Sequence, residues 1–297
     1  MTELSSHADV LTAEEFAHLS GPRCAVLGQP IEHSLSPVLH TAGYEALGLD
    51  FTYARIEAGQ ARDVRHLLEA ADSNVRGFSV TMPIKSDALE LADLATTRAH
   101  EIGAANTLVP TEDGKWLADN TDVDGVTACL ESVRKQGVEL DGTQAVVVGN
   151  GGTARPAVAA LAAAGCTHVT VLARSERALN LQALVESFGM EFSWHRFDEP
   201  GLAASTRSAS VVISTVPAHA AENLCEDLCH ARAIIDVIYD PYPTPLLTAA
   251  RDAGIPHADG LRMLAGQAEE QFRLFTGHEV PSGLMLATVL QAKAEAH

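Results

Sequence analysis

The feature of this sequence that most restricts its fold is a glycine-rich segment that joins an apolar run to an alanine-rich one. Residues Gln144–Val148 are mostly apolar and β-branched, which predicts a buried strand. The segment Gly149-Asn150-Gly151-Gly152-Thr153-Ala154 follows directly, and the alanine-rich composition of Ala154–Ala164 predicts a helix. A buried strand, a glycine turn and a helix in this order are typical of a dinucleotide-binding α/β unit.

The small residues of this glycine segment each have a physical role in such a unit. Gly149 permits a tight turn, Gly151 lets the backbone approach a pyrophosphate, and Ala154 allows the helix to pack closely on the strand. Backbone N–H groups and the positive end of the helix then hold the phosphates. The predicted cofactor-binding residues in this segment are Gly149, Asn150, Gly151, Gly152, Thr153 and Ala154.

The residues after the next predicted strand favour NADP as the cofactor. This strand, His168–Leu172, is followed by Arg174, Ser175, Glu176 and Arg177. NAD-binding units usually carry an acidic residue here for the ribose 2′-OH, whereas arginines suit a 2′-phosphate. Glu176 weakens this interpretation, and the alternative is that both arginines belong to the solvated start of a helix.

Strand and helix patterns alternate along most of the chain. The Asp113-Gly114 dipeptide predicts a hairpin, Thr12 and Glu15 resemble a capping box, and Ser36 before Pro37 predicts an N-cap. The predicted strands are 22–28, 51–56, 77–81, 107–110, 116–118, 144–148, 168–172, 211–214 and 233–237. The predicted helices are 12–19, 37–47, 61–71, 85–95, 122–135, 154–164, 178–188, 246–253, 260–275 and 282–296. We therefore expect an α/β fold: an N-terminal α/β domain with a largely parallel sheet and a Rossmann-type doubly wound domain.

The net charge and the cysteines exclude several classes of binding partner. The chain has 20 Lys and Arg residues against 39 Asp and Glu residues, a formal net charge of -19. Such a chain repels phosphate backbones and anionic lipids, so neither nucleic acid nor membrane is expected as a partner. The sequence has no signal-peptide pattern and no run of about 18 apolar residues, which predicts a cytoplasmic protein. The five widely spaced cysteines predict incidental thiols, and we expect no metal site.

Four polar patches in the first domain do not fit an ordinary core. Ser34 and Ser36 precede a predicted helix and suit a bound carboxylate, unless Ser36 is simply an N-cap. Lys85 follows a predicted strand and would otherwise be an ordinary surface charge. Asn106 lies beside a turn of small residues, and Asp122 follows an Asn-Thr pair before a helix, where capping is the alternative.

These patches, together with the glycine segment, resemble the shikimate dehydrogenase family from about residue 22 to the C-terminus. The matching stretches in chain order are Gly28–Ser34, Thr81 with Lys85, Gly103–Thr107, Asn120–Asp122, Gly149–Ala154, Asp236–Tyr239, and Gly260 with Met263, Leu264 and Gln267. The chain departs from the family pattern at Ser79, Ala118, Ala173 and 214–218. These departures bear on substrate choice and cofactor affinity more than on the class of reaction.

The resemblance implies a reversible NADPH-dependent reduction of 3-dehydroshikimate to shikimate, in the biosynthesis of chorismate and the aromatic amino acids. It implies Lys85 and Asp122 as the catalytic pair, with Ser34 and Ser36 on the substrate carboxylate. Further substrate contacts are expected from Thr81, Asn106, Tyr239 and Gln267. Outside the glycine segment, the expected cofactor contacts are Arg174, Ser175, Arg177, Thr215, Val237 and Gly260.

The resemblance also implies a domain layout. Residues 1–21 form an N-terminal extension, and 22–125 form a substrate-binding catalytic domain. Residues 126–259 form a Rossmann NADP-binding domain, and 260–297 are helices that pack on the substrate domain. The active site is then expected in the cleft between the two domains. A monomer and a homodimer both remain open.

In the expected reaction Lys85 donates the proton to the carbonyl oxygen and Asp122 orients Lys85 and a ring hydroxyl. The nicotinamide supplies hydride, so the reaction needs no metal. The alternatives are a quinate or dual quinate/shikimate dehydrogenase that uses NAD, an enzyme similar to methylenetetrahydrofolate dehydrogenase, and a non-catalytic NADP-binding regulator. The paired serines and Arg174 argue against the first alternative, and the paired serines have no obvious use in the second.

Overall fold

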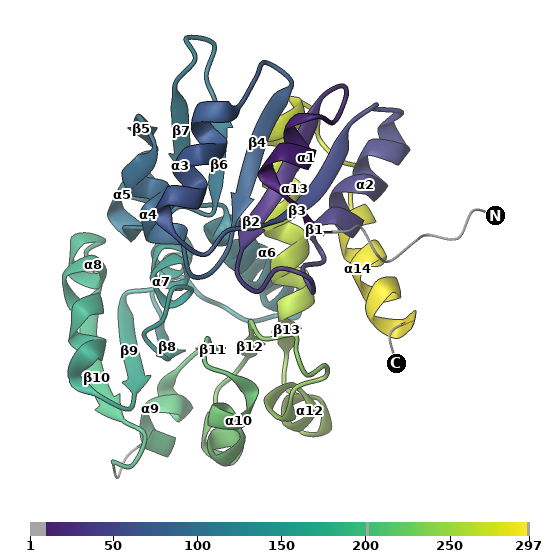
Figure 1. The fold of residues 1–297 in the computed structure, drawn as a ribbon. Coiled ribbons are helices and arrows are strands. Elements are labelled where there is room, and N and C mark those ends of the chain that lie inside the picture. Colours follow the sequence, from purple (N-terminus) through teal and green to yellow (C-terminus); the bar gives the residue numbers. More distant parts are fainter. Residues whose placement is uncertain (1–9, 200–201, 296–297) are drawn as a thin grey trace. The chain divides into compact units, whose positions relative to one another are not determined.

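The chain forms two compact units (Figure 1). The computed structural model describes residues 10–199 and 202–295, so positions 1–9 of the predicted extension and Ala296 of the last predicted helix lie outside the described residues. The first unit runs to Thr121 and resumes at Gln267, and the second unit is Asp122–Gly266. The chain therefore crosses between the units at 121/122 and at 266/267, where the sequence predicted domain boundaries at 125/126 and 259/260.

The first unit contains a mixed, largely parallel sheet in the order β1-β3-β2-β4-β6-β7-β5. Its strands are β1 (Val10–Leu11), β2 (Arg23–Gly28), β3 (Thr52–Glu57), β4 (Val75–Val80), β5 (Leu94–Ala95), β6 (Thr107–Pro110) and β7 (Trp116–Asp119). Strand β6 runs antiparallel to β4, and β7 runs antiparallel to β6. The start of β6 and the end of β7 therefore lie at the edge where β2 and β4 have their carboxyl ends.

Helices cover both faces of this sheet, and its core is apolar. The helices are α1 (Ala13–Ala17), α2 (Ser36–Leu47), α3 (Ala61–Ala70), α4 (Lys85–Leu91), α5 (Thr97–Ile102), α14 (Leu284–Glu295) and the later part of α13 (Gly260–Thr276). Leu27, Phe78 and Leu108 are fully buried in the main cluster. Helix α14 packs against α2, which joins the end of the described chain to its beginning (Figure 1).

The structure corrects three local predictions in this unit. Ser36 is the first helical residue and not the N-cap, because Leu35 occupies that position in an αR conformation. The helix predicted over 85–95 ends at Leu91, and strand β5 follows it. Helix α5 was not predicted, although Thr96 caps it through a hydrogen bond from the Ala99 amide. The Thr12–Glu15 capping box is confirmed, with both of its reciprocal hydrogen bonds present.

The second unit has a fully parallel sheet in the order β10-β9-β8-β11-β12-β13. Its strands are β8 (Gln144–Val148), β9 (His168–Ala173), β10 (Glu191–Arg196), β11 (Val211–Ser214), β12 (Ile234–Asp236) and β13 (His257–Asp259). The chain first builds outward from β8 through β9 to β10 and then returns to add β11, β12 and β13 on the other side. This order confirms the doubly wound prediction and puts the topological switch point between β8 and β11.

Helices cover both faces of the second sheet, because its strands are apolar on both sides. Val147 packs in one cluster with helices α6 and α7, whereas Val146 and Val148 pack in the other. The helical segments are α6 (Asp122–Lys135), α7 (Ala154–Ala163), η1 (Glu176–Leu181), α8 (Gln182–Ser187), α9 (Leu202–Ser208), α10 (Ala218–Ala221), η2 (Glu222–Leu224), α11 (Cys225–Leu228), α12 (Pro245–Asp252) and the start of α13. The α-helix predicted over 178–188 is wrong in its first half, which is the 3₁₀ segment η1. Strands β10 and β13 and helix α9 were not predicted.

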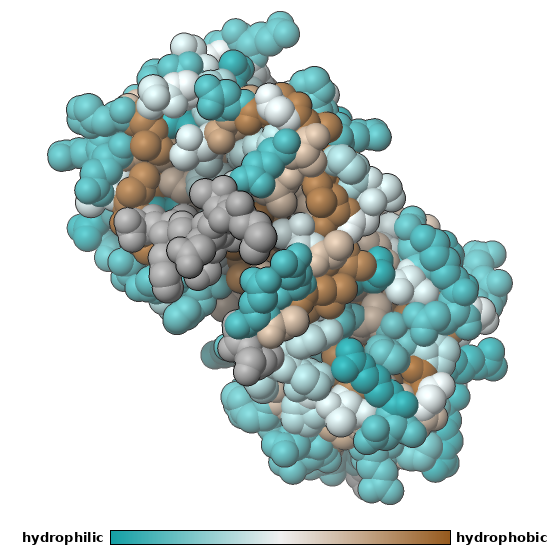
Figure 2. All heavy atoms as spheres, turned by 90° about the vertical axis from the view of Figure 1, so that its right-hand side faces the viewer, coloured by the Kyte–Doolittle hydropathy of each residue, from teal (hydrophilic) through white to brown (hydrophobic). Residues whose placement is uncertain are grey.

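Hydrophilic residues cover most of the face of the molecule drawn in Figure 2, in keeping with the acidic composition. Within the described ranges, no helix combines the length and the apolar composition that crossing a lipid bilayer requires.

Candidate active site

The backbone around Lys85 is fixed at the carboxyl edge of the first sheet. Just past β4, the Thr81 amide donates to the Leu27 carbonyl of β2, with N and O 2.8 Å apart. Lys85 is the first residue of α4, and its carbonyl accepts from the Ala105 amide at 2.9 Å. This bond ties the start of α4 to the loop that leads into Asn106. The Lys85 side chain is half-buried.

The Ser34 backbone is held by a buried arginine that sequence reasoning did not identify. Arg55 of β3 donates to the Ser34 carbonyl through both Nε (3.1 Å) and Nη2 (2.6 Å), and its side chain is buried. The Ser36 amide donates to the Ser34 hydroxyl at 3.4 Å. The Arg55 guanidinium in this turn and the Ser34 and Ser36 hydroxyls at the start of α2 together favour an anionic ligand such as a carboxylate.

Asn106 connects the start of β6 to the residues that follow β7 through its buried side chain. Its Oδ1 accepts from the Thr121 amide at 2.7 Å and from the Thr107 hydroxyl at 2.8 Å. Its Nδ2 donates to the Thr121 hydroxyl at 2.9 Å. These bonds fix Thr121, and Asp122 is the next residue in the chain, so its backbone starts from an anchored point.

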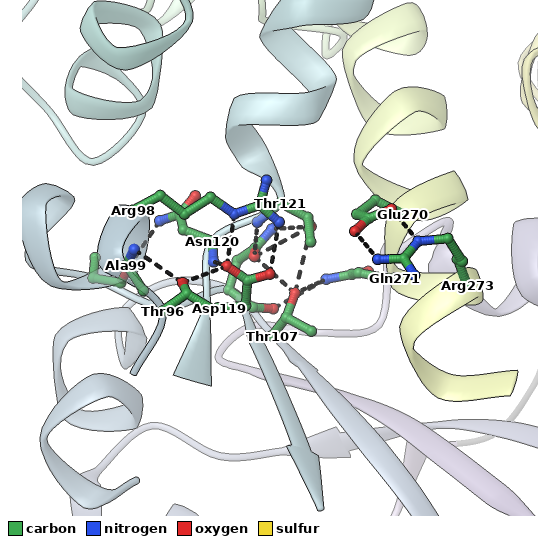
Figure 3. Close-up of polar contacts among 12 residues, drawn as sticks. Thr96, Arg98, Ala99, Thr107, Asp119, Asn120, Thr121, Glu270, Gln271 and Arg273 are labelled. Atoms are coloured by element: carbon green, nitrogen blue, oxygen red, sulfur yellow. Dashed lines mark hydrogen bonds and ion pairs between the residues drawn. The ribbon is translucent and has the colours of Figure 1, made fainter. Parts of the chain in front are cut away.

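Asp119, the last residue of β7, holds the segment that leads to Asp122 through its carboxylate (Figure 3). Its carboxylate accepts from Arg98 Nε and Nη2, both at 2.6 Å, from the Thr96 hydroxyl at 2.7 Å, and from the Asn120 amide at 2.8 Å. Burial alone would raise the pKa of Asp119, but the bonds from Arg98 and Thr96 outweigh it and hold that pKa below its usual value.

Gln271 is a second functional candidate that sequence reasoning missed. It lies on α13 and is 1% exposed. Its Nε2 donates to the Asn106 carbonyl at 3.0 Å and to the Thr107 hydroxyl at 2.9 Å, and its Oε1 accepts from the Ser79 hydroxyl at 2.8 Å. Its four-residue spacing from Gln267 on one helix was a signal that could have identified it.

The predicted substrate residues divide between the two units. Six of them lie in the first unit, and five of these are near the carboxyl edge of its sheet: Ser34, Ser36, Thr81, Lys85 and Asn106. Gln267 is the residue at which α13 re-enters this unit, and it is 8% exposed. Asp122, which is 6% exposed, and Tyr239 belong to the second unit. Burial raises the pKa of the Tyr239 hydroxyl.

The glycine segment has the geometry that a dinucleotide requires. Gly149 has a φ of +101°, and a Cβ there would lie 2.7 Å from both the Thr215 Oγ1 and the Val216 Cγ1. Gly151 and Gly152 are exposed, and a Cβ on either would meet no heavy atom within 4 Å. The backbone is therefore open to a ligand at these two positions. Ala154 is fully buried, which fits its predicted packing role.

The other predicted cofactor residues follow the ends of neighbouring strands. Arg174 and Ser175 come directly after β9 and are exposed, and Arg177 is exposed in η1. The Thr215 hydroxyl, after β11, donates to the Val148 carbonyl at 2.8 Å. Gly260 lies against the Val237 backbone, so closely that a Cβ would collide with the Val237 carbonyl. These residues fit a dinucleotide laid across the carboxyl ends of the strands.

Asp236 holds the backbone of the loop that carries Val237 and Tyr239. Its carboxylate accepts from the Thr244 hydroxyl at 2.6 Å and from the Ile238 amide at 3.2 Å. Burial raises the pKa of Asp236 to about 6. In the part of the chain that the structure describes, no group of three or more His, Cys, Asp or Glu side chains could hold a metal ion.

Comparison with known families covers most of the chain. Residues 26–108 match the model of the shikimate dehydrogenase substrate binding domain. Residues 131–233 match the shikimate / quinate 5-dehydrogenase model, and 260–290 match the shikimate 5'-dehydrogenase C-terminal domain.

Individual relatives agree with these matches. The shikimate dehydrogenase (NADP(+)) of Citrifermentans bemidjiense is 38% identical over 268 residues, which are 88% of this chain and 91% of the relative. The crystal structure of Mycobacterium tuberculosis shikimate dehydrogenase is 42% identical with a TM-score of 0.84, and the match covers 91% of this chain and 99% of that one. The shikimate 5-dehydrogenase of Thermus thermophilus, solved in complex with NADP(H) and shikimate, is 32% identical with a TM-score of 0.75, and the match again covers 91% and 99%. On this evidence, the chain belongs to the shikimate dehydrogenase family.

Proposed function

We propose that this protein catalyses the reversible, NADP(H)-dependent reduction of 3-dehydroshikimate to shikimate, a step in the biosynthesis of chorismate and the aromatic amino acids. The observation that carries the proposal is the near-complete match to a structure with NADP(H) and shikimate bound. The reaction requires a substrate site and a cofactor site. The first unit has candidate substrate residues at the carboxyl edge of its sheet, and the second has an open glycine segment for the cofactor.

The substrate is held through its carboxylate and ring hydroxyls. Ser34 and Ser36 bind the carboxylate, and the Arg55 guanidinium holds the Ser34 backbone through its carbonyl. Thr81, Asn106, Tyr239 and Gln267 contact the ring. Hydroxyl and amide groups suit ring hydroxyls, because each can both donate and accept a hydrogen bond.

The cofactor lies on the second unit. The backbone of Gly149–Thr153 and the start of α7 at Ala154 hold the pyrophosphate. Arg174, Ser175 and Arg177 hold the 2′-phosphate, and Thr215, Val237 and Gly260 line the remaining length. Bound NADP(H) exchanges hydride with the substrate carbon.

Lys85 and Asp122 are the catalytic pair. In the reductive direction the Lys85 ammonium donates a proton to the carbonyl oxygen, and in the oxidative direction the amine takes that proton back. Asp122 accepts hydrogen bonds from Lys85 and from a ring hydroxyl, and thereby orients both. The anchoring of Thr121 by Asn106 fixes the backbone from which Asp122 starts.

We further propose that the protein works in the cytoplasm as a monomer or a homodimer. Support for a reducing compartment comes from the cysteines, because Cys24, Cys129, Cys166, Cys225 and Cys229 are all free thiols.

Steady-state kinetics with two acids and two cofactors test the proposal. The expected result is that shikimate with NADP⁺ gives the highest kcat/KM, and that quinate or NAD⁺ lowers it at least about tenfold, the equivalent of one good charge-assisted contact. Equal rates on quinate would favour the dual enzyme, which the second family description also covers. No NADPH formation with either acid would contradict the proposal and favour a non-catalytic NADP-binding protein.

A further inference from the structure

Arg196 lies at the same edge of the sheet as the two arginines expected to hold the 2′-phosphate, although it is about 20 residues from them in sequence. It is the last residue of β10, a strand that the sequence did not predict. Strands β10 and β9 are parallel, and Arg196 pairs with Ala173, the residue directly before Arg174. Arg196 is therefore next to the last residue of β9, at the carboxyl edge of the sheet from which Arg174 and the η1 segment continue.

The Arg196 side chain also points to the relevant face of the sheet. Side chains alternate between faces along a strand, and Phe192 and Trp194 of β10 pack on the cluster that contains Ala173. Arg196 continues this series and shares that face. Segment η1, which carries Glu176 and Arg177, contributes Ala178 and Leu181 to the same cluster. Arg196 thus belongs to the same corner of the unit as the first turn of η1.

The charges at this corner need compensation before an anion can bind. The Arg196 Nε lies 3.1 Å from the Asp198 Oδ1. The pKa of Arg196 is raised mainly by its bond to and charge attraction with Asp198, and further by the charges of Glu199 and Glu176. Asp198 thus pairs with this arginine, and Glu199 and Glu176 add to the negative charge that acts on it. Without it, Glu176 and Asp198 would repel a phosphate placed beside Arg174.

We propose that Arg196 is a third cation of the NADP 2′-phosphate site and a determinant of the preference for NADP over NAD. Glu176 and Asp198 are its counter-ions when no phosphate is bound. This resolves the conflict noted in the sequence, where Glu176 stands between two arginines that should bind an anion. The proposal rests on the proposed cofactor and deepens it.

Binding of two small adenosine ligands isolates the 2′-phosphate. Adenosine 2′,5′-bisphosphate and adenosine 5′-phosphate differ only in that group, so the ratio of their Kd values, measured by calorimetry, reports the contribution of the 2′-phosphate. Arg196→Gln should weaken binding of the bisphosphate about fivefold to tenfold and leave the monophosphate within about twofold. Arg196→Lys, which keeps the charge, should recover most of the loss. Glu176→Gln should strengthen bisphosphate binding.

Arg232→Gln is the matched control, because Arg232 is exposed in the same unit but precedes β12, at the opposite edge of the parallel sheet. The proposal is overturned if Arg196→Gln and Arg232→Gln bind the bisphosphate equally well, or if Arg196→Gln weakens both ligands to the same extent. Failure of the proposed function would look different: the wild-type protein would form no NADPH from shikimate, whatever the adenosine ligands do.

Discussion

The candidate substrate edge in the first unit and the candidate cofactor edge in the second are built in opposite ways. The first is a network of buried polar groups that bond to one another, centred on Asn106, Asp119 and Gln271. The second consists of exposed backbone at Gly151 and Gly152 and exposed cationic side chains. A preorganised site holds a small ring in one orientation, whereas an open edge accepts a long ligand through backbone N–H groups and charge. Substitutions in the two regions should therefore have different signatures.

The largest effect is expected at Lys85, the proposed proton donor. Lys85→Ala should lower kcat at least about 100-fold, because it removes the proton donor, with little change in the KM for shikimate. A control at Lys115, an exposed lysine of the same unit paired with Asp113, should leave kcat unchanged as Lys115→Ala. A fully active Lys85→Ala enzyme would remove Lys85 from the mechanism.

Gln271 tests whether the substrate edge depends on its buried network. Gln271→Leu removes the acceptor of the buried Ser79 hydroxyl and one of the two donors to the Asn106 carbonyl, so the free energy of unfolding should fall by about 2 kcal/mol. Because the loss disturbs Asn106, the KM for shikimate should rise more than the KM for NADP⁺. Denaturant unfolding and kinetics measure both quantities.

The matched control for this variant is Gln291→Leu, on an exposed residue of α14 that bonds only locally to Glu295. Equal increases in both KM values for Gln271→Leu would indicate general destabilisation and would break the proposed difference between the two edges.

Substitutions at two glycines of the same segment should have different effects, one on stability and the other on cofactor binding. Gly149→Ala forces a side chain into a φ of +101° and against Thr215, so the free energy of unfolding should fall by about 1–3 kcal/mol. Gly151→Ala meets no protein atom within 4 Å, so its thermal midpoint should match the wild type while its KM for NADP⁺ rises. If Gly151→Ala bound NADP⁺ normally, the cofactor backbone contact would not be at Gly151.

The smallest expected effect on catalysis is at Asp236, which contributes to the pH dependence of the free energy of unfolding. Burial raises its pKa to about 6 in the folded protein from 3.8, so the folded state binds more protons than the unfolded state between these values. Asp236 therefore makes stability fall as pH rises from about 4 to about 6. Asp236→Asn should remove this contribution, a change of about 2 kcal/mol across that range in unfolding experiments at several pH values. A stability profile parallel to that of the wild type would contradict the assignment.

Sequence reasoning recovered the second unit well because its strands are buried on both faces. Gln144–Val148, Val211–Ser214 and the helix Asp122–Lys135 have the predicted bounds. It failed at β10, where the polar residues Glu191, Ser193 and His195 alternate with aromatic ones at the edge of the sheet. Edge strands lack the continuous apolar run that marks a central strand.

The candidate site was predictable only where its residues belong to local sequence motifs. Motif residues such as Lys85 and Gly149 stand in recognisable local patterns. Arg55, Asp119 and Gln271 lie outside these motifs, because each bonds to residues far away in sequence: Arg55 to Ser34, Asp119 to Arg98, and Gln271 to Ser79 and Asn106. Only the paired register of the strands and the return of α13 to the first unit bring these groups together.

The most direct test of the whole account follows the hydride itself. NADPH carrying deuterium at its transferable position is mixed with 3-dehydroshikimate and the wild-type protein, and the product is examined by mass spectrometry. The account predicts shikimate that contains a single deuterium bonded to the former carbonyl carbon. Shikimate without the label, or no shikimate at all, would contradict it.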